Sequence, residues 1–248
     1  MKNKQKQDDT LDAMFSGVIG QEYDTLKLIC PLATKMSQLV GVGLKEYANQ
    51  QNSAEYSVLE LGGGTGITTL AILTADERIN VLSVDNEPTM QNQAKQSLQT
   101  WVANERLTFK TQDALSVLKQ TPSESIDIVA TAYTLHNFLH DYRAEVIAEI
   151  YRILKPGGFF INGDRYALDD ISEHTRIVQQ QVSSFFKALI AIDKLDVLEH
   201  WIVHLISDES ENHLMRETIS LKQLEQVAFK QVRLSHRCAE NALVSAVK

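Results

Sequence analysis

The sequence predicts an α/β fold in which a mostly parallel sheet is covered by helices on both faces. Short apolar runs rich in β-branched residues alternate with segments of helical periodicity. The first apolar run leads directly into a glycine-rich turn at Gly62–Gly66. Hydrophobic residues make up 44% of the 248 residues and charged residues 23%, which is enough to build a buried core. Right-handed crossovers should connect the strands.

The N-terminal two thirds supplies the alternating elements. Helical spacing over residues 23–48 is interrupted at Pro31, and Pro88 suits the first turn of a later helix. Lys155 followed by Gly157 and Gly158 is typical of a helix end. We expect strands at 56–61, 80–84, 107–110, 126–131 and 159–162, and helices at 67–74, 88–102, 114–119 and 141–154.

The alternation stops after Gly163. Residues 164–229 are too many for a bare loop in a compact domain, and their apolar spacing predicts two helices. This helical insertion either packs on the core or forms a lid or a homodimer interface. Residues 231–237 and 242–247 then predict a terminal antiparallel hairpin with a turn at Glu240 and Asn241.

Composition limits the partners and the compartment. The net charge of −8 argues against nucleic-acid binding. No apolar run reaches the ~18 residues of a membrane span. The polar first ten residues lack a signal-peptide core, and Cys30 and Cys238 have no paired spacing, so we expect a cytoplasmic protein with free thiols.

The glycine-rich turn excludes two common nucleotide motifs. A P-loop needs Lys after its last glycine, but Ile67 follows Gly66. A dinucleotide fingerprint has the spacing GxGxxG, whereas Gly62, Gly64 and Gly66 give GxGxG. Glu60 precedes these glycines and would repel a pyrophosphate, so it favours a ligand with a positively charged amino-acid end.

Several motifs together resemble those of the class I S-adenosylmethionine-dependent methyltransferases. Residues 60–66 (ELGGGTG) match the family's E/D-x-G-x-G-x-G loop, and residues 152–158 (RILKPGG) match its R-x-L-K-P-G-G turn. The resemblance runs from about Tyr56 to the C-terminus. It implies a Rossmann-like seven-stranded sheet, a methyltransferase domain over 55–248 with a helical insertion at about 164–229, and an N-terminal helical segment over 1–54 as a candidate lid.

The resemblance also implies how S-adenosyl-L-methionine would bind. The glycines would approach its methionine part, Asp85 would accept from both ribose hydroxyls, and Asp113 would accept from the adenine amino group. Asp113 could equally cap the helix that starts at Ala114, and Tyr23 could either cover the cofactor or pack in the core. The cofactor-binding residues implied are Tyr23, Glu60, Gly62, Gly64, Gly66, Asp85, Asn86, Asp113, Ala114 and Thr131.

Two features narrow the acceptor to a small molecule. The Asp/Asn-Pro-Pro-Tyr run of nucleobase methyltransferases is absent, and Leu135-His136-Asn137-Phe138 resembles a stretch common in small-molecule methyltransferases. Residues 85–90 (DNEPTM) resemble a run of the carboxy-S-adenosylmethionine synthase relatives. However, residues 63–65 read GGT where those synthases usually have Cys and Ser, so their unusual cofactor is not carried over.

His136 and Tyr133 are the candidate catalytic residues. An imidazole can take a proton near neutral pH, although His136 could instead be a structural residue. His200 and His204 are four apart, but no Glu follows His200, and we expect solvated or capping roles and no metal site. A non-catalytic cofactor-binding or regulatory subunit and a protein methyltransferase remain alternatives, because they would share these motifs.

Overall fold

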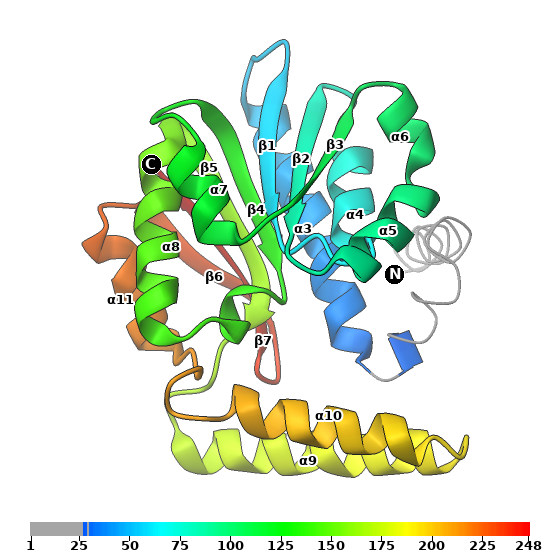
Figure 1. Cartoon of the computed structure of the whole chain (residues 1–248). Coiled ribbons are helices and arrows are strands. Elements are labelled where there is room, and N and C mark those ends of the chain that lie inside the picture. Colours follow the sequence, from blue (N-terminus) through cyan, green and yellow to red (C-terminus); the bar gives the residue numbers. More distant parts are fainter. Residues whose placement is uncertain (1–26, 29) are drawn as a thin grey trace, which may run out of the picture.

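A seven-stranded sheet with the strand order β3-β2-β1-β4-β5-β7-β6 forms the centre of the protein (Figure 1). The structure is a computed structural model, and it describes residues 27–28 and 30–248. Strands β1 to β5 pair in parallel, and β7 is antiparallel to both of its neighbours, β5 and β6. The predicted Rossmann-like fold class, including the terminal antiparallel hairpin, is therefore confirmed.

The described elements follow the expected order along the chain. The strands are β1 (Tyr56–Leu61), β2 (Ile79–Asp85), β3 (Leu107–Thr111), β4 (Ile126–Ala132), β5 (Leu154–Arg165), β6 (Lys230–Cys238) and β7 (Asn241–Val247). The helices are α3 (Pro31–Gln50), α4 (Ile67–Ala75), α5 (Pro88–Ser97), α6 (Gln99–Ala103), α7 (Ala114–Gln120), the short 3-10 helix η1 (Leu135–Asn137), α8 (His140–Ile153), α9 (Ile171–Ile190), α10 (Leu195–Asp208) and α11 (Glu217–Gln226).

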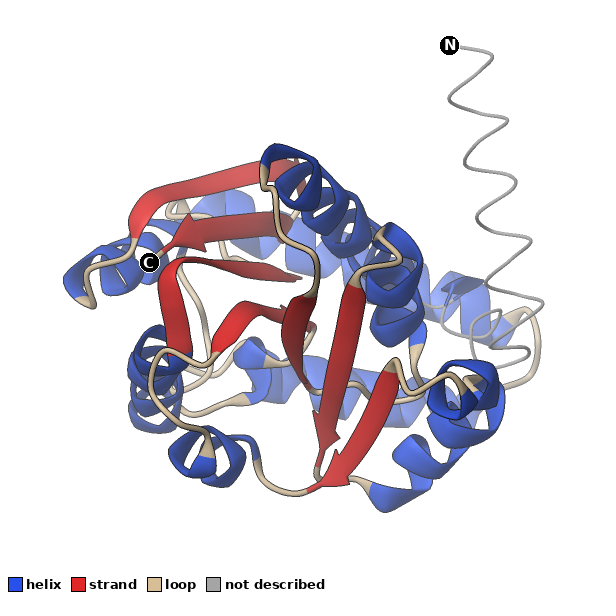
Figure 2. Cartoon of the chain, turned by 90° about the horizontal axis from the view of Figure 1, so that it is seen from above, coloured by secondary structure: helices blue, strands red, loops and turns tan. Residues whose placement is uncertain are grey.

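Helices cover both faces of the sheet (Figure 2). Alternate residues of β1 belong to different cores, because side chains of a strand point to opposite faces. Val58 packs in the core shared with α3 and α4, whereas Leu59 and Leu61 pack in the core shared with α7, α8 and α11. Both faces of β1 are thus buried, as expected for a parallel strand.

Three elements differ from their sequence-based expectation. Residues 88–102 form two helices, α5 and α6, separated at Leu98, whose φ of −107° and ψ of 19° are not helical. Strand β5 begins at Leu154 rather than Phe159, because Leu154 pairs with Ile126 of β4 and because Gly157 and Gly158 exchange main-chain hydrogen bonds with Lys248. The expected helix break at Pro31 is the start of α3.

The inserted region contains three helices instead of two. Helices α9 and α10 pack on each other around Phe185, Leu189 and Leu198, and lie apart from the two layers on the sheet (Figure 1). Helix α11 instead returns to the sheet, where Leu224 joins the core beside β6 and α8. Only α9 and α10 therefore form a separate layer that can shape a site.

Two expectations about the N-terminal part and the membrane can be compared with the structure. Half of the candidate lid segment 1–54, including Tyr23, lies outside the described residues, although α3 within it packs on α4 and β5. Among the described helices, none combines the length and the apolar character needed to cross a lipid bilayer.

Candidate active site

A cavity of about 480 Å³ opens where the glycine-rich loop, the end of β4 and the α9–α10 pair meet. The loop contributes Gly62, Gly63 and Gly64 to its wall, and the segment after β4 contributes Tyr133 and His136. This is the edge formed by the carboxyl ends of the parallel strands, where open α/β sheets bind their ligands. The cavity is therefore the candidate active site.

The loop's glycines are required by its backbone. Gly62 has a φ of +70° and Gly64 a φ of +52°, which is the left-handed region that side chains disfavour. A Cβ at Gly62 would also lie 2.0 Å from the hydroxyl oxygen of Thr134. At Gly64 the space is open, with only the Met90 methyl group 3.8 Å away. Backbone at Gly64 can thus be approached closely by a ligand.

Asp85 lies at the end of β2 and holds the glycine loop from the side. One carboxylate oxygen accepts from the main-chain N–H of Gly64 at 2.8 Å, and the other accepts from that of Glu87 at 2.8 Å. Each oxygen keeps a further acceptor position, so the ribose role predicted for Asp85 is sterically available. Asp85 is half-buried, and Asn86 beside it is exposed; neither belongs to the cavity wall.

Glu60 lies beneath the loop rather than in the cavity wall. Its side chain is fully buried, its Oε2 accepts a 2.6 Å hydrogen bond from the Thr69 hydroxyl, and its Oε1 has no hydrogen-bond partner among the described residues. A Cβ at Gly63 would lie 3.0 Å from Glu60 Oε2, which places the carboxyl group directly under Gly63. Burial raises the pKa of Glu60 to about 7, although hydrogen bonds from Ser83 and Thr69 oppose this rise.

Gly66, Asp113, Ala114 and Thr131 also lie outside the cavity wall. Asp113 caps α7 by accepting from the Ser116 N–H at 2.9 Å, and its other oxygen accepts a 2.5 Å hydrogen bond from the Tyr142 hydroxyl. Ala114 follows it as the first residue of α7. Thr131 is fully buried in β4, and its hydroxyl has no partner among the described residues. The capping alternative for Asp113 is therefore realised, and its adenine role stays a prediction.

His136 is buried in η1 and faces the cavity. Its Nδ1 lies 2.5 Å from a carboxylate oxygen of Asp164, whose other oxygen accepts from the Leu135 N–H at 3.0 Å. Burial opposes the ionisation of Asp164, but the charge and hydrogen bond of His136 outweigh it and lower the pKa of this carboxyl group. An Nδ1–H that donates to Asp164 leaves Nε2 free as an acceptor toward the cavity.

Tyr133 forms the neighbouring part of the wall, with its ring edge against His136 at a centroid distance of 5.9 Å. Its hydroxyl donates to the side-chain oxygen of Asn241, and burial raises its pKa well above the ordinary value. The geometry suits a residue that shapes the cavity. Its predicted catalytic role is not tested by these contacts.

A cluster of carboxylates surrounds Arg165 at the acceptor end. Burial disfavours the charge of its guanidinium, but nearby carboxylates raise its pKa. The contacts are 2.6 Å to Glu209, 3.4 Å to Glu240 and 3.8 Å to Asp208. Arg165 is the one described Lys or Arg residue in the cavity wall, and its charge is already matched by these carboxylates.

Comparison with known proteins identifies the part of the chain that carries the glycine loop. Residues 58–158 match a family described as "Methyltransferase domain". The chain is 25% identical, over 96% of its length and 91% of the relative's, to a carboxy-S-adenosyl-L-methionine synthase of Shewanella amazonensis. It is 33% identical, over 45% of its length and 44% of the relative's, to a demethylmenaquinone methyltransferase of Leptospira interrogans.

The domain match and these relatives together support a class I S-adenosylmethionine-dependent methyltransferase. Its cofactor is S-adenosyl-L-methionine, and the protein is a methyltransferase. The fold agrees: the CurJ carbon methyltransferase superposes with a TM-score of 0.64 and 16% identity, over 98% of this chain and 70% of the other.

The cavity also uses residues from outside the matched part of the methyltransferase domain. Asp208 and His204 of α10, Glu240 before β7 and Phe185 of α9 all belong to its wall. No motif in the sequence predicts that these residues line the cavity, although His204 and Asp208 are four apart and share a face of α10. Cys30 lies in the same part of the wall, where it packs against the cluster that contains Phe185, and burial raises its pKa to about 12.

Proposed function

We propose that the protein transfers the methyl group of S-adenosyl-L-methionine to an uncharged or positively charged small molecule. The observation that carries this proposal is one continuous cavity whose wall contains both the glycine loop and His136 with its Asp164 partner. A volume of about 480 Å³ is in the range of small-molecule sites. The α9–α10 pair closes its outer side and would exclude water.

The charges in the wall favour this class of acceptor. Arg165 already pairs with three carboxylates, so its positive charge is not available to an anionic substrate. Asp208 and Glu240 in the same wall would repel an anion. These charges also argue against the reaction named for the carboxy-S-adenosyl-L-methionine synthase relatives, since that reaction must accommodate an additional carboxylate.

The residue roles follow from this arrangement. The acceptor atom uses its lone pair to bond the methyl carbon, the carbon–sulfur bond breaks, and sulfur keeps that electron pair as a neutral thioether. When only the cofactor and the acceptor are bound at the site, Nε2 of His136 takes the proton that the acceptor loses. Within the proposal, Tyr23, Asn86, Ala114 and Thr131 keep the cofactor contacts that the family resemblance implies, and Asp113 keeps its role at the adenine.

Asp85 provides the test of the cofactor end. Asp85→Ala removes a charged acceptor and should weaken binding of S-adenosylhomocysteine about tenfold to a hundredfold in a calorimetric titration. Asp85→Asn is the matched variant, because its amide oxygen can still accept from Gly64 while the charge is lost. Unchanged affinity in a folded Asp85→Ala protein would contradict the ribose role.

Methyl transfer itself is tested with cofactor that carries a labelled methyl group. The purified protein is incubated with a whole cell extract, and the label is expected in a small molecule, with S-adenosylhomocysteine as the co-product. The Asp85→Ala protein should show reduced transfer at limiting cofactor. Label in protein would favour protein methylation, and cofactor binding without any transfer would favour a regulatory subunit.

We also propose that the protein forms a homodimer through the outer face of the α9–α10 pair. Phe186 and Ile190 of α9 and Val203 and Ile206 of α10 are each 44–68% exposed. Large exposed apolar side chains gathered on one helix pair are typical of protein interfaces. A double change of Ile190 and Ile206 to Lys should convert a dimer to a monomer in a light-scattering mass measurement. Ile219→Lys on α11 is the control, and a monomeric wild-type protein would refute the proposal.

A further inference from the structure

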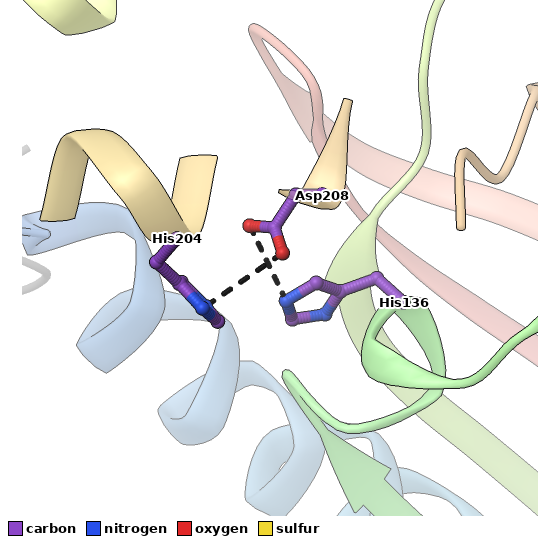
Figure 3. A group of neighbouring side chains, drawn as sticks. All are labelled: His136, His204 and Asp208. Atoms are coloured by element: carbon purple, nitrogen blue, oxygen red, sulfur yellow. Dashed lines mark ion pairs between the residues drawn. The ribbon is translucent and has the colours of Figure 1, made fainter. Parts of the chain in front are cut away.

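Three potential metal ligands meet at the acceptor end of the cavity. They are His136 of η1 and His204 and Asp208 of α10, and their ligand atoms all lie within 4.8 Å of one another. Figure 3 shows both imidazoles approaching the carboxylate of Asp208. The Nε2 atom of His136 lies 3.8 Å from one carboxylate oxygen, and Nε2 of His204 lies 3.7 Å from the other. All three residues belong to the cavity wall.

The separations are close to those of a coordination sphere. Metal–nitrogen bonds of about 2.0–2.1 Å place neighbouring tetrahedral ligand atoms roughly 3.3 Å apart. The two distances to Asp208 run to different carboxylate oxygens and exceed this separation by about half an ångström. Separations within the set reach up to 4.8 Å, so the side chains must rotate inward to share one ion. Both distances to Asp208 are also too long for hydrogen bonds, so neither histidine forms a hydrogen bond with Asp208.

His136 has the outer partner that metal-binding histidines usually have. Its Nδ1 lies 2.5 Å from Asp164, a carboxyl group with no exposed surface. A histidine that binds a metal through one nitrogen normally donates the other N–H to a carboxylate or carbonyl, which fixes the tautomer and the ring orientation. The Asp164–His136 contact therefore orients Nε2 toward His204 and Asp208.

Carboxylates outnumber cationic groups around the site, although Arg165 lies 3.8 Å from Asp208 and His174 lies 2.8 Å from Glu209. The carboxylates of Asp164, Asp208, Glu209 and Glu240 lie around the site, and Arg165 is the guanidinium that pairs with three of them. Arg143 is near Asp164, but it donates its hydrogen bonds to the main-chain oxygens of Leu135, Phe138 and His213. A buried cluster in which carboxylates are in excess is stabilised by a bound cation.

We propose that His136, His204 and Asp208 bind one divalent transition-metal ion. Two imidazoles and one carboxylate suit Zn²⁺, Co²⁺, Mn²⁺ or Fe²⁺ better than Mg²⁺ or Ca²⁺, which prefer oxygen ligands. Three protein ligands leave at least one coordination position open, and the cavity lies on that side.

The open coordination position adds to the proposed function a way to activate the acceptor. An acceptor oxygen bound there would lose its proton to solvent more readily, and its lone pair would then attack the methyl carbon. In the metal-loaded protein His136 is a ligand, and the metal replaces its bare Nε2 as the group that activates the acceptor. This last step rests on the proposed methyl transfer, whereas the metal site does not.

The test measures metal binding without cofactor or acceptor. Untagged protein is freed of metal with a chelator and titrated with Co²⁺, whose visible absorption reports its coordination, and then with Zn²⁺ in competition. The wild-type protein should bind one ion per chain with nitrogen-containing coordination. His204→Ala should lower the affinity roughly 100-fold, and Asp164→Asn, which changes the outer partner of His136, roughly tenfold to a hundredfold.

His200→Ala is the matched control. His200 is exposed, lies on the same helix one turn from His204, and is not part of the cluster, so this variant should bind Co²⁺ as the wild-type protein does. The proposal is overturned by the absence of a Co²⁺ spectrum, or by equal binding in the His204→Ala protein. Failure of methyl transfer in a protein that binds one Co²⁺ would instead refute the proposed function and leave the metal site intact.

Discussion

Replacing His136 with alanine should lower the rate of methyl transfer by roughly 100-fold or more, while the affinity for S-adenosylhomocysteine changes little. His136 faces the acceptor end of the cavity, and its Nδ1 is fixed by Asp164 at 2.5 Å. The cofactor end is formed by other residues, so turnover and cofactor binding should separate. Turnover is measured under saturating cofactor once an acceptor is in hand, and affinity by calorimetry.

Two further variants control this prediction. His136→Gln can still donate a hydrogen bond to Asp164 and so avoids leaving a buried carboxylate without a partner, but it cannot take up the proton. His140→Ala is the matched control, because His140 is exposed, contacts the Leu214 carbonyl and lies outside the cavity. If both folded His136 variants keep full turnover, catalysis depends on proximity and exclusion of water, and His136 is only part of the wall.

The glycine loop and the elements beside it could be predicted from sequence because they are close together along the chain, whereas the cofactor contacts assigned to them stay predictions. Strand β1, the glycine loop and α4 follow one another directly, and Asp85 ends the next strand. Such strand–loop–helix units have local signatures. The same reasoning placed the start of β1 and the hairpin of β6 and β7 near their observed positions.

The sequence predicted His136 and Tyr133 as candidate catalytic residues, but His204 and Asp208 could not be placed beside them, because these residues come together only through tertiary packing. The α9–α10 pair carries His204 and Asp208 to His136, and no sequence spacing relates η1 to α10. Sequence alone therefore paired His204 with His200, its neighbour on the helix. The rings of His200 and His204 do stack at 6.4 Å, but the structure places His204 beside Asp208 and His136 instead.

The position of Glu60 was predictable in principle from the alternation of β1. Leu59 and Leu61 face one core, so Glu60 must share the opposite face with Val58. Because helices cover both faces, an acid at that position is buried. The structure puts its fully buried carboxyl group under the loop, and its predicted role toward the cofactor stays a prediction.

The cofactor-free protein should become less stable as the pH rises from about 5 to about 8, and Glu60→Gln should remove much of this dependence. The pKa of Glu60 is about 7 in the folded protein, raised from 4.5 by burial. Below the lower value both the folded and the unfolded chain hold the proton. Between the two values the unfolded chain releases it while the folded chain keeps it, so the free energy of unfolding falls as the pH rises.

The expected loss from Glu60 is roughly 3 kcal/mol once the pH exceeds the folded pKa. The free energy of unfolding is measured by urea titration at a series of pH values for the wild-type and Glu60→Gln proteins. Glutamine has nearly the same shape, and its amide oxygen can accept from the Thr69 hydroxyl as Glu60 does. Glu55→Gln is the control, because Glu55 is exposed just before the same strand and should leave the pH dependence unchanged.

Parallel curves for the wild-type and Glu60→Gln proteins would show that Glu60 does not titrate in this range. A flatter plot of the free energy of unfolding against pH for Glu60→Gln would mean that the buried acid at position 60 lowers the stability of the wild-type protein near neutral pH. The position of that acid directly under Gly63 gives a reason, since an ionised carboxyl group there attracts the positively charged amino-acid end of the cofactor. Glu60→Gln should then bind S-adenosylhomocysteine more weakly above the folded pKa of Glu60 while being the more stable protein.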